Sequence, residues 1–62
     1  MTYLRNLRNI RRDKGITQQE LDTLAGLPPG TIAQLEQKRR EPKVGTAIKI
    51  ALCLDCSVEE LI

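Results

Sequence analysis

Residues 17–36 decide the fold of this chain, and they read TQQELDTLAGLPPGTIAQLE. The first four residues form a capping-box pattern, in which the Thr17 hydroxyl accepts a hydrogen bond from a backbone N–H and the Glu20 side chain reaches back to the Thr17 amide. A helix is therefore predicted to start at Gln18. Gly26 can end that helix, and Pro28 favours an extended backbone at Leu27, so a sharp turn is expected next.

A second short helix follows the turn and is predicted over residues 29–37, with Pro29 in the first position, where its missing N–H costs nothing. Two short helices joined by a tight turn, the second with a polar face, can place that second helix in the major groove of DNA. This unit is predicted to be held together by its apolar positions, which are Leu21, Ala25, Leu27, Ile32 and Leu35.

The flanking segments also have helical periodicity, which predicts a single all-α domain of five helices over residues 1–62. A first helix is expected over residues 2–14, with Gly15 as a left-handed stop. A fourth is expected over residues 44–54, and Ser57 to Glu60 forms a second capping-box pattern that opens a last helix of barely two turns. The predicted inward positions of the first and fourth helices are Leu4, Leu7, Ile10, Ala47, Ile48, Ala51 and Leu54.

The small size of the chain favours a binding surface over a catalytic pocket. A domain of 62 residues has too few side chains to build both a core and an enclosed active site. The absence of histidine removes the commonest general base and metal ligand. No nucleophile–base pair or phosphate-binding loop is present either, so we expect neither enzymatic activity nor a cofactor.

Basic residues form two clusters in the sequence. Five of the ten Lys and Arg residues fall in the first fourteen positions, and four more lie in residues 38–43. If the clusters converge in the fold, they create one basic face suited to a nucleic acid. The alternative is a solvated charged surface with no partner.

The two cysteines, Cys53 and Cys56, are interpreted as packing residues. Two thiols without an imidazole cannot complete a tetrahedral zinc site, which would have to be shared between two copies of the chain. A thioredoxin-like redox role would need strands around the pair, and none is predicted. No segment is long and apolar enough for a membrane span or a secretion signal, so a cytoplasmic location is expected.

Beyond these patterns, residues 10–61 resemble the lambda-repressor-like family, the Cro and repressor type also called XRE-like. The similarity is ordered along the chain and includes Gly26 at the turn and Glu36 in the second helix of the unit. The other matching segments are Ile10-Arg11 before Gly15, Thr17-Gln18, Thr31-Ile32, Arg39-Arg40-Glu41-Pro42, Ala51-Leu52-Cys53-Leu54 and Ser57-Val58-Glu59-Glu60-Leu61.

The resemblance implies which residues contact bases. Gln34 is the best candidate, since a glutamine can pair with adenine N6 and N7, but the sequence alone also allows a solvated helix residue. Pro29 and Gly30 bring no side-chain donor to the groove, which gives DNA shape a larger part in recognition. The full set of residues implied to lie at or near the bases is Pro29, Gly30, Thr31, Ala33 and Gln34.

The resemblance also implies residues that position the protein on DNA. Gln18 is expected to anchor a phosphate at the start of its helix. Arg11 and Glu36 match a family ion pair that orients the recognition helix. The other expected phosphate contacts are Gln37, Lys38, Arg39, Arg40 and Lys43, any one of which could instead be a solvated loop residue.

Two residues depart from the family pattern. Asp22 stands where alanine is usual, at the close approach of the two helices, and must turn outward, find a partner or loosen the packing. Lys38 stands where a glycine commonly ends the recognition helix, and a lysine in a left-handed conformation costs about 1 kcal/mol.

The resemblance implies double-stranded DNA as the partner, with a two-fold symmetric operator, a weak homodimer and action as a repressor. The expected dimer contact is the apolar surface near the chain's end, formed by Leu52, Cys53, Cys56, Val58 and Ile62. The alternative is a protein-interaction module, such as an antitoxin-like partner of another protein, that keeps the same fold. The retained Gln18, Gln34 and basic segment favour DNA.

Overall fold

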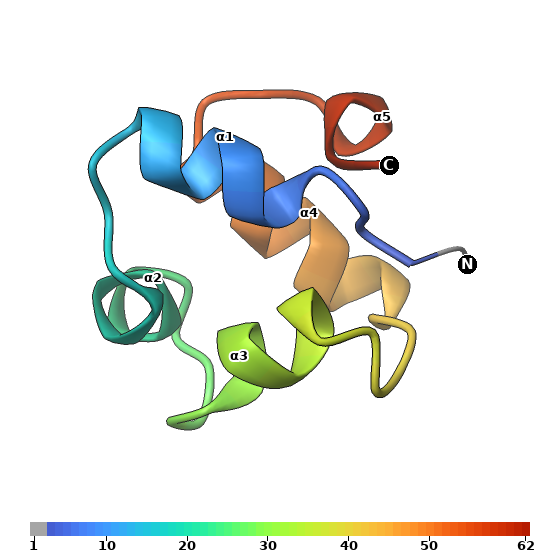
Figure 1. The fold of residues 1–62 in the computed structure, drawn as a ribbon, viewed down its shortest axis with the longest axis horizontal. Coiled ribbons are helices and arrows are strands. Elements are labelled where there is room, and N and C mark those ends of the chain that lie inside the picture. The colour runs from blue at the N-terminus through green and yellow to red at the C-terminus, as the bar shows by residue number, and fades with distance from the viewer. Residues whose placement is uncertain (1–2) are drawn as a thin grey trace.

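The protein folds into five helices and no strand within residues 3–62, which are the residues described by a computed structural model. The helices are α1 (Leu7–Asp13), α2 (Gln18–Leu24), α3 (Thr31–Glu36), α4 (Val44–Cys53) and α5 (Val58–Leu61). Figure 1 shows α2 nearly end-on, with α3 beside it and α4 passing behind α1 through the middle of the molecule. The predicted all-α, five-helix fold is confirmed.

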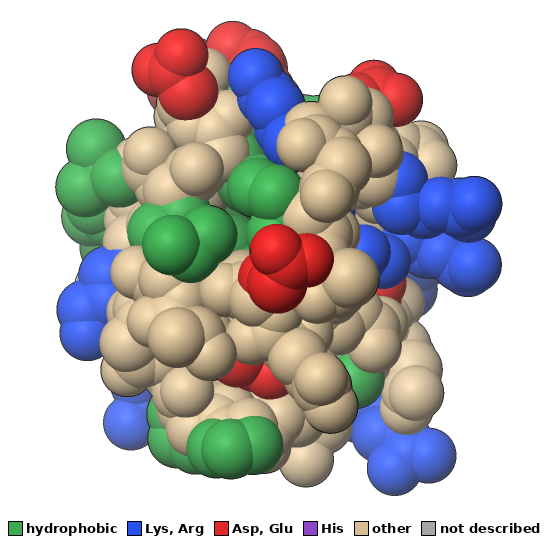
Figure 2. Space-filling model, turned by 90° about the vertical axis from the view of Figure 1, so that its left-hand side faces the viewer, with side chains coloured by type: hydrophobic (Ala, Val, Ile, Leu, Met, Phe, Trp, Pro, Cys, Tyr) green, Lys and Arg blue, Asp and Glu red, His purple; other side chains and the backbone are tan. Residues whose placement is uncertain are grey.

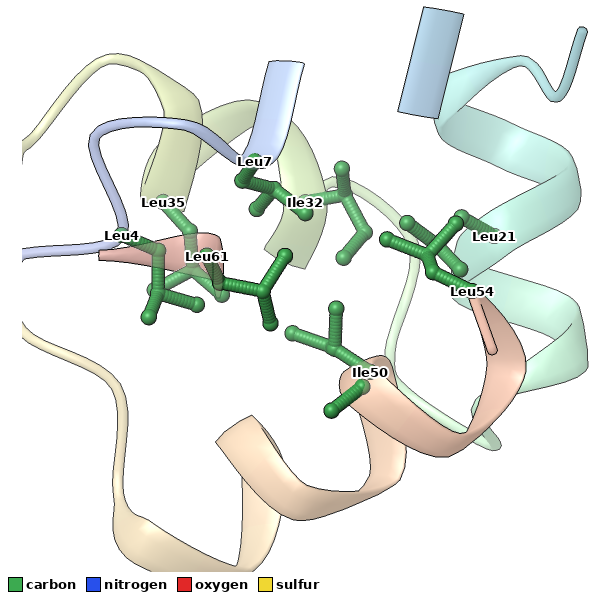
Figure 3. Packing of buried hydrophobic residues seen from close by; sticks show 9 residues of the cluster. Leu4, Leu7, Leu21, Ile32, Leu35, Ile50, Leu54 and Leu61 are labelled. Atoms are coloured by element: carbon green, nitrogen blue, oxygen red, sulfur yellow. The ribbon is translucent and has the colours of Figure 1, made fainter. Parts of the chain in front are cut away.

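The core is built from aliphatic side chains that come from all five helices and from the segment before α1. Their side chains point toward one another in the space between the helices (Figure 3). Burying aliphatic surface is the main favourable contribution to folding in a domain of this size. The buried cluster consists of Leu4, Leu7, Leu21, Ile32, Leu35, Ile50, Ala51, Leu54 and Leu61.

Four helices end in the same way, with a residue of positive φ after the last turn. Gly15 and Gly26 end α1 and α2 with φ of 70° and 67°, as predicted for left-handed stops. Lys38 and Asp55 end α3 and α4 with φ of 58° and 53°, although neither is a glycine. After α3, for example, the Lys38 amide donates to Leu35 O and the following amide to Gln34 O, both at 3.2 Å. This pair of bonds is a Schellman motif, which satisfies carbonyls that the helix leaves free.

The two predicted capping boxes differ. At α2 both halves are formed, because the Glu20 amide donates to Thr17 Oγ1 and the Thr17 amide donates to Glu20 Oε1, each at 3.1 Å. These bonds lower the pKa of Glu20. At α5 the Glu60 amide donates to Ser57 Oγ at 3.2 Å, and the reciprocal bond is not among those formed in residues 3–62.

Helix bounds differ from prediction at three places. The first helix begins at Leu7 rather than at residue 2, and Thr2 lies outside the described residues. Residues 5–6 form a turn that leads into α1. The recognition helix begins at Thr31, so Pro29 is not its first residue, because Gly30 adopts a left-handed φ of 89° and serves as the N-cap. The last helix has four residues and makes one turn rather than two.

The prediction that Ile48 is buried is wrong. Its side chain is 47% exposed, whereas Ile50 is fully buried. The inward stripe of α4 contains Ala47, Ile50 and Ala51, with the helical spacing of three and four residues. Ile48 lies one residue further round the helix and therefore belongs to the outer face.

The two ends of the domain are joined. The Asn6 amide donates to Leu61 O at 2.8 Å, and the Asn6 side-chain nitrogen donates to Glu60 O at 3.0 Å. Figure 1 shows the segment that leads into α1 and the C-terminus on the side of the molecule away from α2. Within residues 3–62, no helix has the length and apolar character needed to cross a membrane.

Candidate nucleic-acid interface

Helices α2 and α3 pack closely through the positions that the sequence indicated. Leu21, Ala25, Ile32 and Leu35 are buried, and Leu27 is half-buried against the core. The turn between the helices contains Gly26, and its length brings the start of α3 next to the middle of α2. The predicted helix-turn-helix unit is therefore present.

Arg11 of α1 and Glu36 at the end of α3 form the expected ion pair. Arg11 Nε lies 2.6 Å from Glu36 Oε2, and Nη2 donates to Oε1 at 3.2 Å. The remaining guanidinium nitrogen donates to the Ile16 carbonyl at 2.7 Å. The two side chains are only 11% and 4% exposed, so the pair is largely removed from water and fixes the last turn of α3 against α1.

Gln18, the expected phosphate anchor, belongs to the same network. Its side-chain nitrogen donates to Glu36 Oε1 at 3.0 Å. The Glu36 carboxylate therefore receives hydrogen bonds from two other helices. The structure places the half-buried Gln18 side chain at the contact between α2 and α3.

Asp22 finds its partner in the backbone of α3. Oδ2 accepts from the Gly30 amide at 3.0 Å, and Oδ1 accepts from the Ile32 amide at 2.9 Å. Asp22 is only 4% exposed. A helix start leaves amides without partners inside the helix and carries partial positive charge, so a carboxylate there is stabilised. The sequence left open whether Asp22 turns outward, finds a partner or loosens the packing, and the structure shows that it finds a partner.

Sequence reasoning flagged Asp22 only as a departure from the family pattern, not as an anchor. A signal was available in Gly30, which has no side chain with which to cap its own helix. An acidic residue in the neighbouring helix can supply the missing acceptor. The pattern shows this only when the spacing between α2 and α3 is known, because the two bonds span eight and ten residues.

The residues implied to contact bases lie in two environments. Pro29, Gly30 and Gln34 are exposed, and Ala33 is half-buried. Thr31 is 5% exposed, and its hydroxyl donates to Pro28 O at 2.7 Å. The structure therefore brings four of the five to the surface around the start of α3 and gives the Thr31 hydroxyl a bond within the turn.

The residues implied to contact phosphates follow α3 directly. They are all exposed and comprise Gln37, Lys38, Arg39, Arg40 and Lys43. Arg40 and Lys43 line a hollow beside Pro28 and Thr46, next to the start of α4. Figure 2 shows the face that carries α2, where Lys and Arg side chains lie mostly around the rim, while acidic and hydrophobic side chains lie both near the centre and at parts of the edge.

Cys53 and Cys56 are free thiols that are half-buried against the core. Desolvation, with a further contribution from Glu60, raises the pKa of Cys56, which keeps this thiol protonated near neutral pH. Among the described residues, no group of three or more metal-binding side chains comes together. The structure thus places both cysteines as packing groups.

The sequence profile of the helix-turn-helix family matches residues 7–61, which include all five helices. The chain belongs to this lambda-repressor-like helix-turn-helix family. Its members are DNA-binding transcriptional regulators, and this places the chain in that functional class.

One relative in sequence and one solved structure are similar to this chain over most of its length. The chain is 37% identical over 57 residues to the uncharacterized HTH-type transcriptional regulator y4dJ of Sinorhizobium fredii, covering 92% of this chain and 74% of that protein. Its fold is similar to the crystal structure of the restriction-modification controller protein C.AhdI from Aeromonas hydrophila, with a TM-score of 0.89 and 30% identity. That match covers 97% of this chain and 91% of the controller protein. The comparisons support the regulator and not the protein-interaction module.

Proposed function

We propose that this protein is a repressor that binds a two-fold symmetric DNA operator as a weak homodimer, with α3 in the major groove. The observation that carries the proposal is the arrangement of α3. Its inner face is buried against α2, its last turn is fixed by Arg11, and Gln34 remains exposed on the outer face. A short helix held in this way can enter a groove without losing the contacts that position it.

Gln34 is the principal base-reading residue in this proposal. Its exposed amide suits the acceptor and donor that adenine presents in the major groove. Ala33 adds an apolar contact for a thymine methyl group, and Pro29 and Gly30 approach the bases through their backbone. Thr31 supports the turn before α3, since its hydroxyl is engaged with Pro28 O.

The exposed segment after α3 supplies phosphate contacts. Lys38, Arg39, Arg40 and Lys43 are all exposed and lie within a stretch of six residues, and Gln37 is exposed beside them. Contacts of this kind position a protein on the duplex and make its affinity depend on salt. Gln18 contributes by holding the start of α2 against Glu36, close to the same edge of α3.

The dimer contact is assigned to the surface around the end of α4 and α5. Leu52 is 76% exposed and Ile62 is 46% exposed, and Cys53, Cys56 and Val58 are half-buried beside them. Apolar side chains grouped in this way favour a protein partner. A two-fold pair would place two copies of α3 on half-sites about 34 Å apart. In this proposal the protein acts in the cytoplasm by binding alone, without catalysis or a cofactor.

The experiment is selection of bound duplexes from a random DNA pool, followed by titration of the selected duplex at several salt concentrations. Gln34→Ala is expected to relax the preference at one base position by about 1–3 kcal/mol. Arg40→Ala is expected to weaken binding to all sequences and to lower the salt slope by about one. Lys49→Ala removes an exposed charge from α4, outside the proposed interface, and serves as the control.

The outcomes separate the proposal from its alternatives. A two-fold symmetric motif, with the stated changes and an unchanged Lys49→Ala, supports it. A motif without symmetry, from a protein that sediments as a monomer on and off DNA, overturns the homodimer. If no motif is enriched and affinity stays weak even in dilute salt, operator binding by α3 is overturned.

A further inference from the structure

The start of α3 has no cap of its own. Gly30 is the N-cap residue and carries no side chain, whereas α2 and α5 each have a hydroxyl at this position that accepts a backbone amide. A side-chain acceptor at the N-cap stabilises a helix start, because it gives a partner to an amide that the helix leaves free. Helices α1 and α4 also lack a side-chain cap from their own N-cap residue, but α3 is the helix that we propose reads DNA, so the partners of its first amides bear on recognition.

The Asp22 carboxylate supplies the missing cap from a different helix. Its two oxygens accept from the amides of Gly30 and Ile32, so each oxygen holds one residue of the first turn. The bonds cross from the middle of α2 to the start of α3. A cap within one chain segment fixes only the helix start, but a cap from α2 also fixes where that start lies relative to α2.

The burial of Asp22 strengthens the restraint that its two bonds place on α3. At 4% exposure the carboxylate has little water to replace a lost bond, and an uncompensated buried charge is costly. Any slide or rotation of α3 along α2 would lengthen at least one of the two bonds. The ion pair at the other end of the helix restrains the last turn in the same way, so α3 is held by a carboxylate at each end.

We infer that Asp22 is a specificity-determining positioning residue, which sets the register of α3 on α2 and thereby the bases that Gln34 reaches, an inference that rests on the proposed DNA binding by α3. Asp22 itself does not touch DNA, because it is buried. Its contribution is to keep the exposed residues of α3 in one place before DNA is bound. If α3 could take several positions along α2, the protein would still bind phosphates nearly as well, but it would discriminate bases poorly.

The test compares wild type with Asp22→Ala and Asp22→Asn on the selected operator and on a scrambled duplex. The readout is the ratio of the two affinities, which does not depend on the fraction of protein that is folded. We expect the ratio to fall at least about tenfold for Asp22→Ala, which is within the discrimination of one bidentate base contact. The salt slope is expected to stay the same, because no phosphate contact is removed.

Asp22→Asn distinguishes the contributions of the two hydrogen bonds that the Asp22 carboxylate accepts. An asparagine has one oxygen, which can still accept from the buried Ile32 amide, and it places an N–H₂ group against the exposed Gly30 amide. Hydrogen exchange should therefore speed up at Gly30 alone in Asp22→Asn and at both amides in Asp22→Ala. The specificity ratio of Asp22→Asn is expected to fall between those of the other two proteins.

Two controls keep this test decisive. Ile50→Val loosens the shared core without removing a hydrogen bond to α3 and lowers stability, while Asp13→Asn removes an exposed negative charge. Both should retain the wild-type ratio. If Asp22→Ala also retains it, Asp22 is only a stabilising residue and the inference is overturned. If wild type itself shows no preference for any duplex, the proposed DNA binding fails first, and exchange at Gly30 and Ile32 still tests the cap.

Discussion

The α2–α3 half of the molecule and the α4–α5 half share one hydrophobic core, but they differ in the charged contacts that are added to it. Buried or nearly buried charges join α3 to its neighbours, with Asp22 at its start and Glu36 at its end. Both halves contribute aliphatic side chains to the shared core, and in the α4–α5 half these are Ile50, Ala51, Leu54 and Leu61. The outer surface of the α4–α5 half carries exposed hydrophobic residues, most of all Leu52.

The difference follows from what each kind of interaction can specify. Hydrophobic burial is non-directional and tolerates small shifts between helices. A carboxylate that receives two amides, or two guanidinium nitrogens, accepts only a narrow geometry. The half that we propose presents side chains to a groove is therefore fixed by directed bonds in addition to its buried aliphatic residues, whereas contact area is the main stabilising contribution in the other half.

The largest effect is expected from Arg11→Met, which keeps the apolar stem and removes the charge. Glu36 would remain buried with only Gln18 as a partner, a loss of about 3–5 kcal/mol. That is comparable with the whole stability of a domain of 62 residues, about 3–9 kcal/mol. Urea unfolding measures the change, and Arg12→Met, at an exposed neighbouring position, is the control.

The double variant Arg11→Met with Glu36→Leu sharpens this result. Removing both charges should recover much of the stability, since a buried ion pair replaced by apolar groups is often neutral or better. If Arg11→Met alone unfolds at the same urea concentration as wild type, the ion pair does not hold α3. The α2–α3 half is then stabilised mainly by its leucines.

A smaller effect is expected in the apolar half, where two isoleucines of α4 should behave differently. Ile50→Ala removes a fully buried side chain and should cost about 2–5 kcal/mol. Ile48→Ala truncates a side chain that is 47% exposed, and the higher helix propensity of alanine offsets part of the loss. Thermal unfolding of both variants compares them, and equal losses would contradict the observed facing of α4.

The smallest effect is expected at Lys38, and it is a gain in stability. Lys38→Gly should stabilise the domain by about 1 kcal/mol, because glycine adopts the positive φ of this residue without strain. The melting temperature would rise by about 4–8 °C. Lys38→Ala keeps the unfavourable backbone and removes the same charge, so it should show no such rise. A matching rise in both variants would assign the effect to charge instead.

Much of the fold could be predicted from the sequence because its signals are local. The capping box at Thr17 and the glycine stops at Gly15 and Gly26 depend only on neighbouring residues, and the structure contains all three. The start of α3 was misplaced because Pro29 is equally suited to a first helical position and to a turn. Ile48 was misplaced because one residue of rotation separates the inner and outer faces of α4.

The candidate site was predictable only in part. The Arg11–Glu36 pair followed from the resemblance, and the structure contains it. The base and phosphate contacts stay predictions until DNA binding is measured. The role of Asp22 was missed, because its partners are backbone amides, which every residue has and no sequence pattern distinguishes. Only the packing of α2 on α3 brings those amides to the carboxylate.

The bond between Asn6 and Leu61 closes the chain into a loop that contains nearly every other residue. Closing so long a loop costs entropy that nearby contacts do not, and contacts between distant residues form slowly during folding. The bond between Asn6 and Leu61 should therefore form after the helix-turn-helix unit has assembled, and it should open before that unit unfolds. The contact between the first and last segments can then open locally while α3 keeps its position, so local opening is confined to a part of the fold other than the one that we propose reads DNA.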